Sequence, residues 1–206
     1  MAKDVCINVD ECEVYSGVAL RILSQDYGDD CVFPLARTFT LVLESCTSED
    51  LDESDDSDDS SELGDKCEGH QANVSAFVLW IKQNLPKVNE VRVQMGHYFN
   101  QGSVCDIHFS KLVSQLYRLG TRIGYSCNNR GDVPEVSQFD EIRDLVHINF
   151  NSEYGSSQFI PLARLNVQTL QSLVIKSRVF YDLDGLIQSP DGDYTTYPCL
   201  HILKLR

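Results

Sequence analysis

The sequence predicts an α/β fold in which short β-strands alternate with amphipathic helices along a single domain, residues 1–206. Apolar residues recur at every second position in seven short runs, which is typical of half-buried strands. Between several of these runs, apolar residues recur at helical spacing. The runs also follow one another at similar intervals, which favours a repeated strand–helix unit.

The seven predicted strands are Val5–Val9, Phe39–Leu43, Val91–Val93, Arg122–Tyr125, Val146–Phe150, Leu173–Ile175 and Leu203–Leu205. Two helices are predicted from an apolar face, at Val74–Leu85 and Phe109–Leu119, and Pro86 and Gly120 are placed to end them. Shorter helices are expected at 17–24, 156–165 and 182–187. Trp80 is expected in the core or between units.

An acidic segment interrupts this pattern. Glu49–Asp65 holds ten Asp and Glu residues, no Lys or Arg, and four serines. Such a run cannot bury enough apolar surface to offset its ordering entropy, so we expect a disordered acidic insertion at about 47–68. It accounts for ten of the fourteen excess negative charges, so the rest of the chain is close to neutral. Phosphorylation of its serines and capture of a basic partner are further hypotheses.

The spacing of the strands distinguishes two architectures. The last paired apolar positions are taken as Val9, Leu43, Val93, Tyr125, Ile148, Ile175 and Leu205. Without the 17-residue acidic segment, successive positions lie 23 to 34 residues apart. Leucine-rich repeats have a period of about 20 to 29 residues, so the spacing favours a solenoid of β-α units with a parallel sheet. A doubly wound α/β domain is the alternative.

A sequence phrase points the same way. Leucine-rich repeats follow the pattern L-x-x-L-x-L-x-x-N/C. The first half is matched by Val88-x-x-Val91-x-Val93, Leu170-x-x-Leu173-x-Ile175 and Leu200-x-x-Leu203-x-Leu205. The residues expected at the Asn/Cys position are Cys12, Cys46, Gly96, Asn128, Asn151 and Arg178. Four of these six are Asn or Cys, which supports a leucine-rich-repeat-like solenoid.

The polar residues on and beside the predicted strands form the candidate binding surface. In a solenoid the exposed parallel sheet is where partners bind. The candidate partner-binding residues are Asn89, Arg92, His147, Asn149, Gln171 and Lys204, with Val174 and His201 beside them. The alternative is that they are merely solvated strand residues. The sequence therefore predicts a non-catalytic protein–protein interaction module.

Enzyme signatures are weak in this sequence. Neither G-x-G-x-x-G nor G-x-x-x-x-G-K-[ST] occurs, so no cofactor is expected. The run Gly124-Tyr125-Ser126-Cys127-Asn128 approaches the G-x-S-x-G nucleophile elbow, but Asn128 replaces the last glycine. We interpret Ser126 as a turn residue and expect no catalytic residue. A hydrolase-like α/β enzyme stays an alternative.

Two Cys-x-x-His pairs are the candidate metal ligands in this sequence. Cys67-x-x-His70 and Cys105-x-x-His108, with His97 between them, have the spacing of two zinc half-sites. Chance spacing is the simpler interpretation, so we expect no metal. The eight cysteines include no C-x-x-C pair, which predicts separate buried thiols in a reducing compartment.

Charge and hydropathy suggest where the chain acts. No signal peptide or membrane-spanning run is recognisable, so we expect a cytoplasmic or nuclear protein. A net charge of −14 repels phosphate backbones and anionic lipid, which argues against nucleic-acid and membrane partners.

Four stretches carry a family resemblance: Phe33–Phe39, Phe109–Leu116, Leu145–Asn149 and Thr169–Leu173. They resemble a group of fungal F-box and leucine-rich-repeat-like proteins, and the resemblance spans nearly the whole chain. It implies the substrate-recognition part of a ubiquitin ligase, which docks to a ligase adaptor through an F-box. This chain opens almost directly with the Val5 strand, so the F-box would have to be supplied elsewhere. The abrupt end after the last strand, without a polar cap, is what a fragment or a shortened relative would show.

Overall fold

The chain forms one seven-stranded sheet in which every neighbouring pair is parallel and the strand order is the chain order. This computed structural model describes residues 3–27, 33–44, 62–95, 106–127, 142–152, 159–177, 184–188 and 194–206. The strands are β1 (Asp4–Asp10), β2 (Thr38–Glu44), β3 (Glu90–Met95), β4 (Arg122–Cys127), β5 (His147–Ser152), β6 (Ser172–Lys176) and β7 (Ile202–Leu205).

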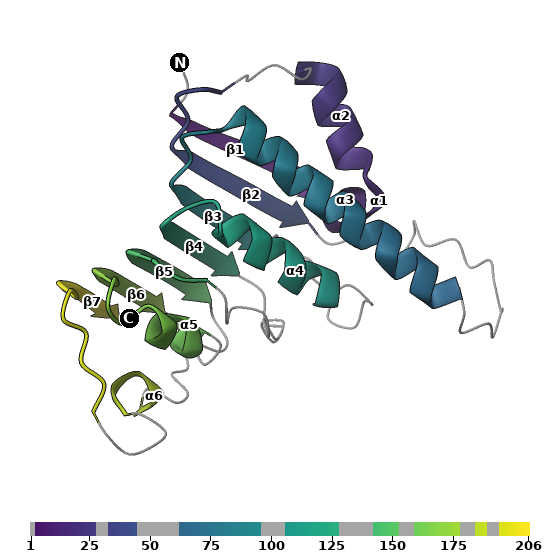
Figure 1. Ribbon diagram of the computed structural model, residues 1–206. Coiled ribbons are helices and arrows are strands. Elements are labelled where there is room, and N and C mark those ends of the chain that lie inside the picture. The colour runs from purple at the N-terminus through teal and green to yellow at the C-terminus, as the bar shows by residue number, and fades with distance from the viewer. Residues whose placement is uncertain are drawn as a thin grey trace.

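The described helices lie between successive strands in the chain, and the described part of the β4–β5 connection has none. The helices are α1 (Glu11–Ser16), α2 (Val18–Tyr27), α3 (Glu62–Asn84), α4 (Asp106–Tyr117), α5 (Phe159–Leu165) and α6 (Asp184–Ile187). Helices α1 to α5 cover one face of the sheet (Figure 1). We call the opposite face, which no described helix covers, the open face.

The core lies between the helices and the sheet, because alternate strand residues point toward the helices. Phe39, Val91 and Ile148 are buried on β2, β3 and β5, and Phe77 of α3 and Leu112 of α4 are buried from the helical side. Trp80 is buried too and its ring approaches that of Tyr27 at 6.4 Å, which confirms its predicted place in the core. The strand β7 differs, since Leu203 and Leu205 are 54% and 42% exposed.

The turn before each strand repeats one hydrogen-bonding step. The carbonyl oxygen of Lys3 accepts from the backbone N–H groups of Arg37 and Thr38, and the carbonyl of Arg37 accepts from Asn89 and Glu90. The same step continues through the carbonyl oxygens of Thr121, Val146 and Gln171, and the carbonyl oxygen of Asn89 accepts from Arg122. We call this series the turn ladder. It uses backbone groups alone and links the turns before successive strands.

The predicted α/β class and parallel sheet are confirmed, and each of the seven predicted strands overlaps an observed one. A doubly wound sheet reverses its strand order at a switch point, and the order β1 to β7 has no reversal. The sequential order and the turn ladder are the arrangement that stacked β-α units produce. The solenoid itself stays a prediction.

The register corrects part of the repeat argument. Tyr125 lies opposite Phe150, not opposite Ile148, and Met95 rather than Val93 lies opposite Leu43. The interpretation of Asn151 as the turn-forming Asn is therefore wrong. Asn151 lies within β5, opposite Ser126 of β4.

Three further expectations change. Helix α3 begins at Glu62, so residues 62–68 of the expected insertion are helical, while residues 47–61 lie outside the described part of the chain. The short helix α1 was not predicted. The backbone N–H of Asp10 donates to the Glu13 carboxylate at the start of this helix, and Gly17 ends it with φ of 79°.

Cys6 is exposed and Cys199 half-buried, both as free thiols, so the expectation of buried thiols is wrong for these two.

Candidate binding hollow on the open face

Polar side chains from five adjacent strands share the open face. The pairing register places Arg92, Gly124, Asn149, Val174 and Lys204 in one row across β3 to β7. A second row holds Gln94, Ser126, Asn151 and Lys176. Because strand residues alternate between faces, every one of these side chains points away from the helices.

A hollow lies where the first row passes through Gly124. Glycine has no side chain, so the floor there is bare backbone between Arg92 and Asn149. The cavity has a volume of about 290 Å³. Its rim and floor are formed by Arg92, Val93, Gln94, Gly124, Tyr125, Ser126, Asn149, Asn151 and Lys176.

A side chain at position 124 would fill this space. A Cβ atom built on Gly124 lies 3.1 Å from Cγ of Arg92, which is tighter than an ordinary van der Waals contact. The neighbouring atom belongs to the exposed Arg92 side chain, whose Cβ follows at 3.6 Å, and the φ angle of Gly124 is outside the left-handed region. The absence of a side chain at Gly124 thus creates the hollow. The backbone conformation at this position does not require glycine.

The floor of the hollow is supported from the helical side. The Tyr117 hydroxyl on α4 donates a hydrogen bond of 2.9 Å to the carbonyl oxygen of Gly124. Complete burial raises the pKa of Tyr117 far above its ordinary value, so the phenol stays protonated and remains a donor. Next to it, the ring of Tyr125 stacks on Phe150 at 5.5 Å, and Phe159 of α5 packs against both.

Two contacts orient side chains around the hollow. The Glu90 carboxylate accepts from Nε of Arg92 at 2.9 Å and forms an ion pair with its Nη2 at 2.7 Å. This holds the guanidinium beside the hollow. The Nδ2 group of Asn151 donates to the Ser126 hydroxyl oxygen at 3.3 Å, which leaves the hydroxyl hydrogen free to donate.

His147 lies on the same face, one row closer to the start of the strands. It is opposite Arg122 of β4, which in turn is opposite Glu90. Burial lowers the pKa of His147, the positive charge of Arg122 lowers it further, and Glu90 opposes both. The imidazole is therefore biased toward its neutral form.

Four of the predicted binding residues belong to the open face. Arg92, His147, Asn149 and Lys204 occupy strand positions that point away from the helices, as the period-2 pattern indicated, and Arg92 and Asn149 border the hollow. Val174 lies in the same row. Whether these residues bind a partner stays a prediction.

Two of the predicted binding residues lie elsewhere. Asn89 and Gln171 each precede a strand by one residue, in the turns whose backbone forms the turn ladder. Their side chains are exposed at the edge of the sheet, so the prediction that they share the face is corrected. His201 occupies the corresponding turn position before β7.

Sequence reasoning missed four polar side chains of the open face that line the hollow: Gln94, Ser126, Asn151 and Lys176. The interpretation of Ser126 as a turn residue is wrong, because it lies inside β4. A nucleophile elbow requires a sharp turn between a strand and a helix, so Ser126 does not have that geometry. Extending the period-2 alternation of β3 to β6 by two residues would have found all four.

The remaining sequence motifs give no site within the described residues. No group of three or more His, Cys, Asp and Glu side chains that could hold a metal ion is found there. Cys105 and His97 of the hypothetical zinc half-sites lie outside the described ranges. No helix in the described part of the chain has the length and apolar character needed to cross a membrane.

The architecture and the site define a class of protein: an α/β protein with a parallel sheet, one face of which is covered by none of the described helices and carries a polar hollow. Comparisons with protein-family models, curated proteins and solved structures found no match to this chain. The resemblance to F-box and leucine-rich-repeat-like proteins therefore stays a prediction.

Proposed function

We propose that this chain is a non-catalytic interaction module that binds a protein partner on the open face of its sheet, in the cytoplasm or nucleus. The observation that carries the proposal is the hollow at Gly124, which is bordered by side chains from four adjacent strands. Strands that are uncovered on one face and packed on the other present polar groups on a rigid support, and a rigid support limits the entropy lost on binding.

The chemistry of the hollow suits recognition. Its polar lining consists of two cations, three amides and a hydroxyl, all of which can donate hydrogen bonds. Within the described lining, neither a histidine nor a carboxylate is present to act as a general acid or base. These groups favour binding over proton-transfer chemistry.

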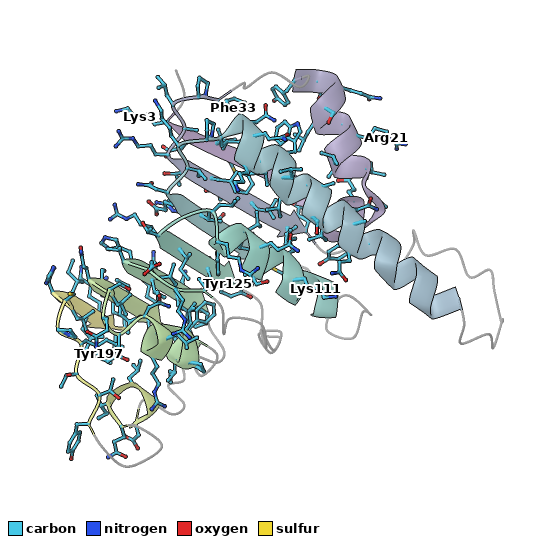
Figure 2. All side chains as sticks on the ribbon, viewed as in Figure 1. Lys3, Arg21, Phe33, Lys111, Tyr125 and Tyr197 are labelled. Carbon is cyan, nitrogen blue, oxygen red and sulfur yellow. The ribbon has the colours of Figure 1, made fainter. Side chains whose placement is uncertain are left out.

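The test compares partner recovery by two double variants of the tagged chain. In the first, Arg92→Ala is combined with Asn149→Ala, which removes two exposed groups of the hollow. In the control, Arg21→Ala is combined with Gln25→Ala, which removes similar groups from the exposed side of α2. Figure 2 shows Arg21 on the outer side of this helix. Thermal unfolding checks that both variants fold.

The expected result is that proteins purified with the wild-type chain are retained by the α2 variant and lost from the hollow variant. Equal recovery by all three chains would contradict the proposal. Recovery of a ubiquitin-ligase adaptor would assign the module to substrate recognition in a ligase. Substrate recognition in a ubiquitin ligase is our second hypothesis, and its support is the sequence resemblance.

A further inference from the structure

The open face has an uneven distribution of charge. Along β3 to β7 the described strands carry four cations, Arg92, Arg122, Lys176 and Lys204, and one carboxylate, Glu90. The described charged residues of β1 and β2 are all acidic: Asp4, Asp10 and Glu44. A chain with a net charge of −14 thus presents a positive surface on five of its seven strands.

Most of this positive charge is available to a ligand. Glu90 neutralises Arg92 in part. Among the described residues, no carboxylate lies within ion-pair distance of Lys176 or Lys204. Both lysines are exposed.

From this charge pattern, and resting on the proposed function, we propose that the partner presents an extended acidic segment, with a carboxylate side chain entering the hollow at Gly124. Arg92 and Lys176 flank the hollow, and Gln94, Ser126, Asn149 and Asn151 offer N–H and O–H donors between them. Carboxylates accept several hydrogen bonds at once, which matches a lining made of donors.

The dimensions fit a polypeptide that crosses the strands. Neighbouring strands lie about 4.8 Å apart, so β3 and β6, which carry Arg92 and Lys176 in adjacent rows, are separated by about 14 Å across the sheet. An extended chain advances about 3.3 Å per residue, so carboxylates four positions apart span nearly the same distance. The acidic strands β1 and β2 repel such a segment and confine it to β3 to β7.

The test measures binding of a fluorescent glutamate peptide of about eight residues, long enough to cross β3 to β7 in extended form. Fluorescence anisotropy at low ionic strength reports its affinity for the full chain. Lysine and glycine–serine peptides of equal length are the comparisons. A thymidine oligonucleotide of matching charge tests whether phosphate is preferred over carboxylate.

Two variants locate the contact. Lys176→Glu combined with Lys204→Glu reverses two exposed charges on the open face, and Arg21→Glu combined with Lys82→Glu does the same on the helical side. Gly124→Val fills the hollow and leaves the charge unchanged. We expect only the acidic peptide to bind, with affinity at least about tenfold weaker for the open-face and Gly124 variants and unchanged for the helical-side variant.

Equal binding of all peptides, an unchanged affinity in the open-face variant, or tighter binding of the oligonucleotide would overturn this inference. These outcomes are separable from failure of the proposed function. If Arg92→Ala with Asn149→Ala still loses protein partners while the glutamate peptide does not bind, the open face binds a partner of other chemistry. If neither experiment shows an effect, both proposals are wrong.

Discussion

The hydroxyl of Tyr117 donates to the carbonyl oxygen of Gly124, so a buried group of α4 holds the backbone that forms the floor of the hollow. Tyr117 belongs to the helical layer and Gly124 to the open face, and this bond joins the two through the sheet. The shape of the hollow therefore depends on packing in the layer behind it.

Tyr117→Phe removes this hydrogen bond and keeps the aromatic ring. Because a buried carbonyl loses a partner, we expect the free energy of unfolding to fall by about 1 kcal/mol in urea titrations. Tyr194→Phe is the control, since Tyr194 is 78% exposed and its substitution should change stability by less than about 0.5 kcal/mol. Equal effects of the two variants would show that the Tyr117 bond does not stabilise the strand.

Gly120 lies where two successive turns meet. A Cβ atom at this position would stand 2.5 Å from the carbonyl oxygen of Asn89, and that oxygen is fixed because it accepts from the backbone of Arg122. We expect Gly120→Ala to lower the free energy of unfolding by about 1 to 3 kcal/mol, because backbone atoms must move apart.

Gly69→Ala is the matched control, measured by the same urea titration. Gly69 lies in α3, and a Cβ atom at this position would meet nothing within 4 Å, so alanine should stabilise the helix by about 0.5 to 1 kcal/mol. Opposite signs for the two glycines are the expected result. A neutral Gly120→Ala variant would show that the turns can separate without cost.

The buried side chain of Asn166 joins α5 to the segment before β5. Its Nδ2 group donates to the carbonyl oxygens of Ile142 and Leu162, and its Oδ1 accepts from the Leu145 N–H, all at 2.9 Å. Asn166→Ala leaves buried groups without partners, so we expect a loss of about 3 kcal/mol in the free energy of unfolding. Asn149→Ala, at an exposed position, should cost less than about 0.5 kcal/mol. Similar losses at the two positions would contradict this account.

His147 predicts a pH dependence of stability. Because burial and Arg122 lower its pKa in the folded state, the unfolded chain binds the proton more readily as the pH falls below the ordinary value of 6.5. Stability contributed by the neutral imidazole is therefore complete above that value and is lost on acidification. Thermal unfolding between about pH 7.5 and pH 5 should show a smaller loss in His147→Gln than in the wild type.

The exposed His201 provides the control for this effect, as His201→Gln. The His201→Gln variant keeps every carboxylate, so their effect on stability at low pH is retained, and it removes one exposed histidine. If His147→Gln and His201→Gln have the same pH profile as the wild type, the environment of His147 does not influence folding.

Alternation of apolar residues was sufficient to predict the strands, because one face of β1 to β6 is packed against the helical layer. The strand β7 keeps the same alternation, although Leu203 and Leu205 are exposed. Helix α1 has only six residues, too few to show a helical period. The start of α3 was missed because residues 62–68 continue an acidic run that favours disorder by composition. Only from Val74 onward does the helix show an apolar face.

The candidate site was predicted in part. Arg92, Asn149 and Lys204 followed from alternation, because each lies between two apolar residues of its strand and successive strand side chains point to opposite faces. The hollow itself could not be predicted, since it depends on the strand register that brings Gly124 between Arg92 and Asn149. In the observed register Tyr125 pairs with Phe150 and not with Ile148. The sequence could not distinguish these two partners, because both are apolar.

The turn ladder has an evolutionary consequence. Each step joins the carbonyl oxygen of one turn to a backbone N–H group of the next, so the connection between neighbouring turns has the same form along the sheet. A genetic duplication or deletion of one whole unit would leave every other step intact. In repeat proteins that stack such units, a change in the number of units alters the width of the sheet surface and requires no new core.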